Sequence, residues 1–295
     1  MVLDFKNGEF IKMRTEADCY LYTNIKMIEE GGFIDINPRP KYTDGTPAHT
    51  KSLNHQYRSY DLSTGDFPIT TLRPIAWKTA IKEILWIYQD ASNSLDLLHN
   101  KYGVYYWDEW PSKDMPGTIG ARYGEVVRRY NLTGNLLQDI KNDPYGRRHI
   151  MDLWQYKELN ETDGLNPCAF LTDWNVRREY LDMLLFQRSG DMLMASGAGG
   201  VNEVQYAALL MMVARHCGYK PGKFTHVICN EQIYDRHWDA AHELQRRFNS
   251  ISSENGSVHL ELNPDKINFY DFTIDDFKMI NYNPIKPQLD LEIAI

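Results

Sequence analysis

A cysteine and an arginine in two neighbouring segments are the strongest candidates for chemistry in this sequence. Cys168 lies in Asn-Pro-Cys-Ala-Phe, and Arg188 lies in Gln-Arg-Ser-Gly. Cysteine attacks electrophiles as the thiolate, and a nearby cation lowers the pKa of the thiol from about 8.5. Residues 168–175 and 179–188 read as strands joined by three residues, which predicts a hairpin that brings Arg188 to Cys168. The alternative is a small buried apolar cysteine.

Further arginines fall where loops are predicted. Arg39 lies in a segment rich in proline and threonine, and Arg147 and Arg148 follow Asp-Pro-Tyr-Gly. They are either solvated charges or, with Arg188, a set that neutralises a phosphate. The formal net charge is −8, which disfavours nucleic-acid binding over a whole surface. Any anion site must therefore be local.

The elements that position these residues alternate between helical and strand-like patterns. Helices are predicted over 76–90, 132–142, 203–216 and 236–248, and strands over 149–154, 168–175, 179–188, 224–229 and 257–262. Residues 36–56 read as a long ordered loop because they are rich in turn-forming residues. The mixture predicts an α+β fold in one domain.

Two features of the first half leave alternatives open. Glu83 falls among apolar positions of the predicted helix 76–90, and is either a surface residue, which the pattern favours, or a buried functional acid. The aromatic run 102–110 precedes the glycine-rich segment 117–124. Such a run forms either the wall of a cleft for a flat ligand or a corner of the core.

Composition and patterning bound the class of protein. The longest apolar run, 207–214, is too short to span a bilayer, and the first residues have no signal-peptide pattern. The four cysteines form no CxxC pair and have no histidine at zinc spacing, so we expect no metal site. Reduced thiols and a cytoplasmic location are the expectation.

The order of the motifs resembles the thymidylate synthase family from about residue 39 to 295. The segments that carry the resemblance are TDGTPAHT (43–50), FPITTLRPIAWKTAIKEILWIY (67–88), GVYYWDEW (103–110), GTIGARYG (117–124), NDPYGRRHI (142–150), NPCAF (166–170), QRSGDM (187–192), VNEVQYAALL (201–210) and YDFTIDDFKMINY (270–282). The resemblance implies one catalytic domain over 1–295, a mixed, bent sheet flanked by helices, and an obligate homodimer through the sheet.

The resemblance also implies a reaction. Cys168 would add to C6 of the pyrimidine of dUMP, and C5 would then attack the methylene group of 5,10-methylenetetrahydrofolate, the co-substrate. Glu83, Tyr123 and Asn202 would be the other catalytic residues: the acid that organises proton transfer, the tyrosine near the C5 proton and the asparagine that reads the base. A closed site protects the exocyclic methylene intermediate from water.

Binding residues follow from the same resemblance. Those for the nucleotide are Arg39, Arg147, Arg148, Gln187, Arg188, Ser189, Gln232 and Tyr234, of which Arg147 and Arg148 would reach the partner subunit's site. Those for the folate are Arg73, Trp107, Trp110, Asp191 and Ile295, the last belonging to a terminal lid.

Several positions depart from the family pattern. Gln232 replaces a ribose-binding histidine, Asn230 and Glu231 stand where Asp and a small residue are usual, and Gly190 stands where Cys or Asn is usual. Leu72 and Arg73 replace two basic residues. The loop 195–202 is about three residues longer than usual.

The departures leave three hypotheses. The first is dTMP synthesis from dUMP. The second is a hydroxymethylase of the same family, in which water is the last nucleophile; it would act on dUMP rather than dCMP, since cytosine-specific relatives carry Asp at the position of Asn202. The third is a non-catalytic nucleotide- or RNA-binding relative, which the presence of Cys168, Glu83 and Tyr123 together disfavours.

Overall fold

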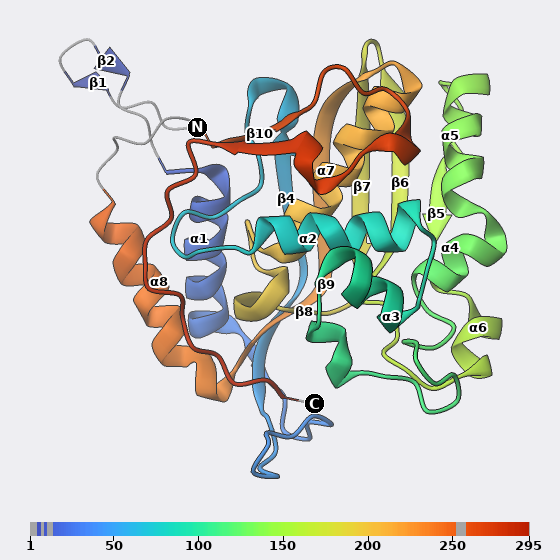
Figure 1. Ribbon diagram of the computed structural model, residues 1–295. Coiled ribbons are helices and arrows are strands. Elements are labelled where there is room, and N and C mark those ends of the chain that lie inside the picture. Colours follow the sequence, from blue (N-terminus) through green and yellow to red (C-terminus); the bar gives the residue numbers. More distant parts are fainter. Residues whose placement is uncertain (1–4, 7–8, 11–13, 252–257, 295) are drawn as a thin grey trace.

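A mixed seven-stranded sheet forms the centre of the computed structural model, which describes residues 5–6, 9–10, 14–251 and 258–294 (Figure 1). The strand order is β3 (Phe33–Ile34), β4 (Thr50–Asp61), β9 (Lys220–Tyr234), β7 (Tyr180–Gln187), β6 (Ala169–Arg177) and β5 (Ile150–Asp152), with β8 (Gly190–Asp191) beside β9. β9 runs parallel to β7 and β8, and the other pairs are antiparallel. The predicted α+β class with a mixed sheet is confirmed.

Helices flank this sheet. They are α1 (Glu16–Gly31), α2 (Trp77–Ile84), α3 (Leu95–Leu97), α4 (Gly124–Tyr130), α5 (Leu132–Asn142), α6 (Tyr156–Glu161), α7 (Val201–Cys217) and α8 (Trp238–Ser250). Two small ribbons complete the fold, β1 (Phe5–Lys6) with β2 (Glu9–Phe10), and β10 (His259–Leu262) with β11 (Phe277–Ile280). The buried helix α7 packs on β7 and β9, α2 packs on α7, and α1 lies between β4 and α8.

The predicted helix over 76–90 consists of α2 followed by a wider, π-type turn at Leu85–Gln89. Its residues Ile81, Ile84, Leu85 and Trp86 are at most 2% exposed and belong to the main core. α7 is buried on nearly every side, as expected from its continuous apolar sequence, and ends at Gly218 in the left-handed conformation.

One predicted loop is partly wrong. Residues 50–56, assigned to the loop 36–56, form the first half of the long strand β4. Polar residues dominate this strand, and its buried side carries Ser52, Arg58 and Tyr60. The usual apolar alternation of a half-buried strand is therefore missing, because an arginine occupies a core position.

Helices cover one face of the sheet more completely than the other. On β7, Leu181, Met183 and Leu185 are buried against the helices, whereas Leu184 and Phe186 are only half-buried. Register places Leu171, Phe186, Val227 and Tyr57 in one line across β6, β7, β9 and β4. We call these four residues the outer row, and its Tyr57 is 61% exposed.

Candidate active site

The predicted hairpin is present and places Cys168 beside Arg188. β6 and β7 pair with Ala169 opposite Gln187, and the Arg188 amide donates to the Cys168 carbonyl at 2.9 Å. The guanidinium of Arg188 donates through Nε to the Pro167 carbonyl and through Nη2 to the Asn166 carbonyl, both at 2.9 Å. Nη2 also lies 3.5 Å from Cys168 Sγ. The arginine is thus fixed against the thiol by the segment that leads into β6.

Two opposing effects act on the thiol. Burial raises the pKa of Cys168, and the positive charge of Arg188 lowers it by a smaller amount. The cation therefore offsets part of the desolvation that would otherwise keep the sulfur protonated. This arrangement suits a cysteine that becomes a thiolate when it reacts.

Tyr123 contacts the backbone of the cysteine. Its hydroxyl accepts a hydrogen bond from the Cys168 amide at 3.2 Å. Tyr123 has φ +44°, a strained conformation for an aromatic residue, and it directly precedes α4. Burial raises the pKa of its phenol, so the group is a neutral hydroxyl at physiological pH.

Glu83 is a buried acid, so the surface interpretation of its pattern is wrong. It is 6% exposed and accepts hydrogen bonds from Trp107 Nε1 at 2.6 Å, from the Tyr106 hydroxyl and from Gln205 Nε2. Burial raises the pKa of Glu83, and these three donors oppose that rise. The carboxylate can therefore stay inside the core because each of its oxygens has a donor.

The aromatic run forms one connected wall beside this acid. The ring of Trp107 makes edge contacts with Tyr123 and Trp110, at centroid distances of 5.4 and 6.0 Å. Trp107 is buried, whereas Trp110 is half-buried. The inner ring thus packs as a corner of the core, whereas the cleft wall stays a prediction that the half-buried outer ring leaves open.

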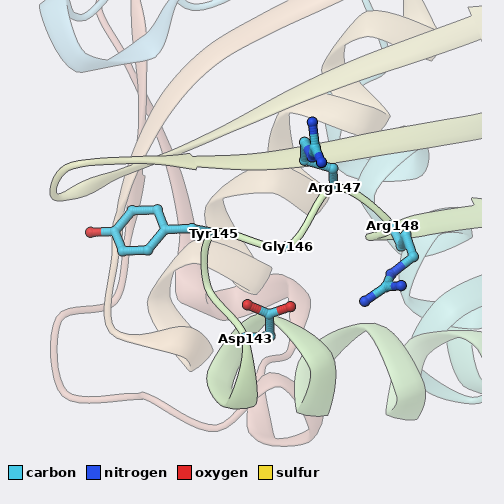
Figure 2. Close-up of a pocket in the computed structure, with 5 residues that line it drawn as sticks. All are labelled: Asp143, Tyr145, Gly146, Arg147 and Arg148. Atoms are coloured by element: carbon cyan, nitrogen blue, oxygen red, sulfur yellow. The ribbon is translucent and has the colours of Figure 1, made fainter.

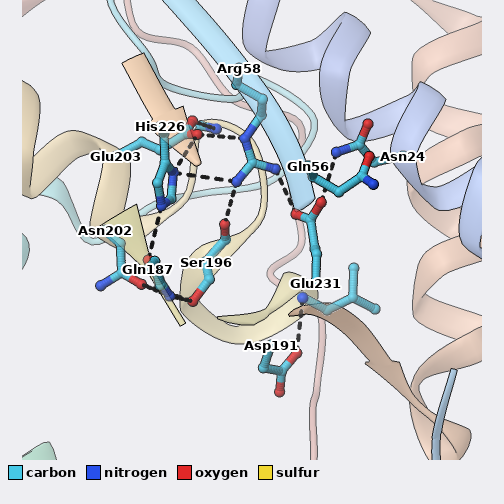
Figure 3. Close-up of polar contacts among 12 residues, drawn as sticks. Asn24, Gln56, Arg58, Gln187, Asp191, Ser196, Asn202, Glu203, His226 and Glu231 are labelled. Carbon is cyan, nitrogen blue, oxygen red and sulfur yellow. Dashed lines mark hydrogen bonds and ion pairs between the residues drawn. The ribbon is translucent and has the colours of Figure 1, made fainter. Parts of the chain in front are cut away.

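Asn202 stands at the first turn of α7 and belongs to a polar cluster (Figure 3). Its Oδ1 accepts from Ser196 Oγ at 2.8 Å, and its Nδ2 donates to Gln205 Oε1 at 3.0 Å. Gln187, which is 1% exposed, donates to Ser196 Oγ at 2.7 Å and lies 3.4 Å from Asn202 Oδ1. Gln187 is thus placed to support Asn202 rather than to reach a ligand itself.

Behind this cluster lies a buried ion group that sequence reasoning missed. Arg58 pairs with Glu203 and with Glu231, each at 2.6 Å, and none of the three is more than 1% exposed. Arg58 also donates to the Ser196 carbonyl at 2.7 Å, and His226 lies 3.0 Å from Glu203. The only signal in the sequence was the unusual Glu231, since Arg58 lies between the predicted loop 36–56 and the predicted helix 76–90, where no element was predicted.

A second group of predicted residues gathers around β8 and the end of β9. Asp191 is opposite Gln232 in register, and its Oδ1 caps the following turn by accepting from the Leu193 amide at 3.0 Å. Burial raises the pKa of Tyr234 to about 12, with smaller contributions from Asp191, Arg39 and Cys168. These residues therefore lie close enough for their charges to influence one another.

Arg73 is buried next to Asp191. It is 5% exposed, and its Nη2 donates to the Met194 carbonyl at 3.3 Å. Burial lowers the pKa of Arg73 to about 10, and the negative charge of Asp191 opposes this. Within the described part of the chain, its buried Nε has no hydrogen-bond partner. A donor of this kind is available to a ligand.

The remaining arginines occupy two separate places. Arg39 is exposed on the loop before β4. Arg147 and Arg148 line a surface pocket with Asp143, Tyr145 and Gly146 (Figure 2). This pocket adjoins Ile150, which is opposite Asp173, five residues and hence about 17 Å along β6 from Cys168. The pair therefore lies apart from the thiol of its own chain.

Three further expectations concern Ser189, the tail and metals. Ser189 is half-buried, and its carbonyl accepts from Gln187 Nε2 at 3.0 Å. Ile295 lies outside the described residues, but Glu292 is tied to Arg236 at 2.8 Å. Among residues 14–251 and 258–294, no three His, Cys, Asp or Glu side chains gather as a metal site requires. No helix in these ranges is long and apolar enough to cross a membrane.

Fold and site together define an α+β protein in which a buried thiol lies against an arginine, an arrangement that suits a cysteine nucleophile. The sequence profile of the thymidylate synthase family matches residues 8–295. A thymidylate synthase of Streptococcus sanguinis is 50% identical over 288 residues, covering 95% of this chain and all of the relative. One from Streptococcus pneumoniae is 49% identical over 286 residues, with the same coverage of 95% and 100%.

A solved structure agrees with these sequences. The thermostable thymidylate synthase A from Bacillus subtilis superposes with a TM-score of 0.83 at 36% identity, covering 95% of this chain and 99% of that one. The chain belongs to the thymidylate synthase family. The resemblance inferred from the motifs is confirmed.

Proposed function

We propose that this protein makes dTMP from dUMP, with 5,10-methylenetetrahydrofolate as donor of both the carbon and the hydride. The observation that carries this function is the thiol of Cys168 held 3.5 Å from the guanidinium of Arg188, within a chain of this family. The relatives that match over their whole length are named thymidylate synthase, so the hydroxymethylase alternative is not favoured.

The mechanism begins at the thiol. Cys168 Sγ forms a bond to C6 of the uracil ring, and the electron pair moves through C5 to O4. A neutral pyrimidine is a weak electrophile, so this step needs a hydrogen-bond donor at O4. Asn202 Nδ2 and the network around Glu83 are the groups available for that purpose.

The later steps complete the transfer. C5 bonds to the methylene carbon of the folate as the bond from that carbon to folate N10 breaks, and C5 then loses its proton, toward Tyr123 and solvent. The bond from the methylene carbon to folate N5 breaks next, and a hydride from the tetrahydrofolate ring converts the exocyclic methylene to methyl. Cys168 then leaves C6, and dihydrofolate is the second product.

The phosphate of the nucleotide requires cations. Arg188 is the cation nearest the thiol, and Arg39 is close enough to lower the pKa of Tyr234. Ser189 follows Arg188 directly and adds a hydroxyl. Gln232 and Tyr234, at the end of β9, would bind the ribose. Together they compensate a dianion in a protein of net charge −8.

The folate would lie along the aromatic wall. Trp110 offers a half-buried ring for a flat pterin, and Asp191 offers a carboxylate to its N–H groups. Arg73 lies near Asp191, and its Nε, which has no partner among the described residues, is a further donor for the folate. The terminal residues that follow Glu292 would close over this ligand and exclude water.

We also propose a homodimer through the sheet. The outer row (Leu171, Phe186, Val227 and Tyr57) is the apolar surface that a second copy would cover. Arg147 and Arg148 precede Ile150, whose partner on β6 lies about 17 Å from Cys168, so they would serve the partner's site. A single catalytic domain over 1–295 and a cytoplasmic location complete the proposal.

The test uses purified protein with dUMP and the folate, and products are identified by mass. We expect dTMP together with the absorbance rise of dihydrofolate formation. Cys168→Ala should reduce turnover to background while dUMP binding, measured by calorimetry, remains. A hydroxymethyl product, or turnover without Cys168, would refute the proposal.

A further inference from the structure

We propose that Ser196 is a positioning residue that holds Oδ1 of the Asn202 amide away from the base and thereby supports the choice of uracil over cytosine. This inference rests on the proposed function, because it assigns Asn202 to the base. Ser196 is the last residue of the π-type turn Met192–Ser196, within the loop that is longer than usual in the family.

Hydrogen bonds run in one direction through this part of the site. Gln187 Nε2 donates to Ser196 Oγ at 2.7 Å, and Ser196 Oγ donates to Asn202 Oδ1 at 2.8 Å. Asn202 Nδ2 donates to Gln205 Oε1 at 3.0 Å, and Gln205 Nε2 donates to Glu83. Figure 3 shows the first two of these contacts.

The direction of these hydrogen bonds is set at both ends by acceptors that cannot donate, the Glu83 carboxylate and the Ser189 carbonyl, which accepts from Gln187 Nε2 at 3.0 Å. The Glu83 carboxylate only accepts, so Gln205 must present its NH₂ group there and its oxygen to Asn202. Asn202 must then present Nδ2 to Gln205 and Oδ1 to Ser196. The assignment of both amides thus follows from their partners.

This orientation has a consequence for the base. Asn202 Oδ1 is occupied by Ser196, whereas Nδ2 has a second hydrogen beyond the one given to Gln205. A free N–H matches the carbonyl acceptor at C4 of uracil and opposes the amino donor at C4 of cytosine. Two groups hold this orientation, Gln205 at Nδ2 and Ser196 at Oδ1. Without Ser196, Oδ1 keeps only the 3.4 Å contact with Gln187, so the amide is held at one end and can rotate to accept from a cytosine amino group.

Several residues that depart from the family pattern hold Ser196 in position. A Cβ on Gly190 would lie 2.6 Å from the Ser196 Cβ, so only glycine leaves room for this serine. Arg58 holds the Ser196 carbonyl at 2.7 Å and is itself paired with Glu231. Gly190, Glu231 and the longer loop, which looked unrelated in the sequence, therefore form one structural unit.

The experiment measures dissociation constants of dUMP and dCMP for the full-length protein by calorimetry, and kcat/KM for both. In Ser196→Ala the preference for dUMP over dCMP should fall about fivefold, the factor that one hydrogen bond of ~1 kcal/mol supplies. Gly190→Ala, which displaces Ser196 without removing it, should shift the preference in the same direction.

Thr133→Val is the matched control. Its hydroxyl is also buried and donates to the Tyr88 carbonyl at 2.9 Å, away from the nucleotide site. It should lose comparable thermal stability without a change in preference. An unchanged preference in both Ser196→Ala and Gly190→Ala would overturn the proposal. Because binding is measured directly, a wild-type protein that binds dUMP but forms no dTMP would refute the proposed function and leave this test valid.

Discussion

Replacement of Arg58 by methionine tests the buried ion group most directly. The change leaves Glu203 and Glu231 without their shared cation at positions that are fully buried. Removing one partner of such a group costs about 3–5 kcal/mol, because the remaining charges are desolvated and unpaired. With an unfolding entropy of about 2.1 cal/mol/K per residue, a chain of 295 residues should lose roughly 5–8 °C in Tm.

The loss should also depend on pH. Burial alone would raise the pKa of Glu203, but Arg58 and His226 more than offset this, so the pKa is lowered. In the wild type, the stability from this carboxylate is present above its unfolded pKa and declines as pH falls. In Arg58→Met the same carboxylate has a raised pKa and becomes protonated on mild acidification. The difference in Tm between the two proteins should therefore shrink from pH 8 to pH 5.

Thermal unfolding by circular dichroism at matched protein concentration provides the measurement. Adding Glu203→Gln and Glu231→Gln to Arg58→Met should restore part of the loss, because no buried charge is then unpaired. A drop of less than about 2 °C at pH 8, or a drop that grows on acidification, would show that the group is not buried and ionised as described.

Two further predictions concern the catalytic site. Glu83→Gln should lower kcat by on the order of 10²-fold. The wild-type activity should decline on acidification at a higher pH than an ordinary glutamate would give, since burial raises the pKa of Glu83. A stopped-assay pH profile that is the same in both proteins would contradict this role of Glu83. Cys168→Ala subunits can be mixed with subunits that carry both Arg147→Ala and Arg148→Ala. Random reassociation should restore about a quarter of wild-type activity, because half of the dimers then hold one complete site. The absence of recovery would argue against a site shared between subunits.

Much of the thiol site follows from local sequence. The short connection at residues 176–178 is enough to predict the β6–β7 hairpin, and the hairpin is enough to bring Arg188 to Cys168. The burial of α7 follows from its continuous apolar sequence. These features depend on neighbours along the chain, which a single sequence displays.

Other features depend on partners that are distant in sequence. Glu83 looks like a surface residue because its donors, Trp107 and Gln205, come from segments 24 and 122 residues away. Arg58 was missed because its strand is polar and its two carboxylates lie 145 and 173 residues away. Buried charge breaks the apolar alternation on which strand prediction depends, so β4 was partly assigned to a loop.

The position of β9 in the sheet has a consequence for synthesis of the chain. β9 joins β4 on one side to β7 on the other, yet it comes after both in sequence. Until residues 220–234 leave the ribosome, β4 and β7 each keep an unpaired edge that can bind other strands. Pairing of β4 with β9 also closes a very long loop, which slows folding. We therefore expect the nascent protein to depend on chaperones until its central strand is inserted.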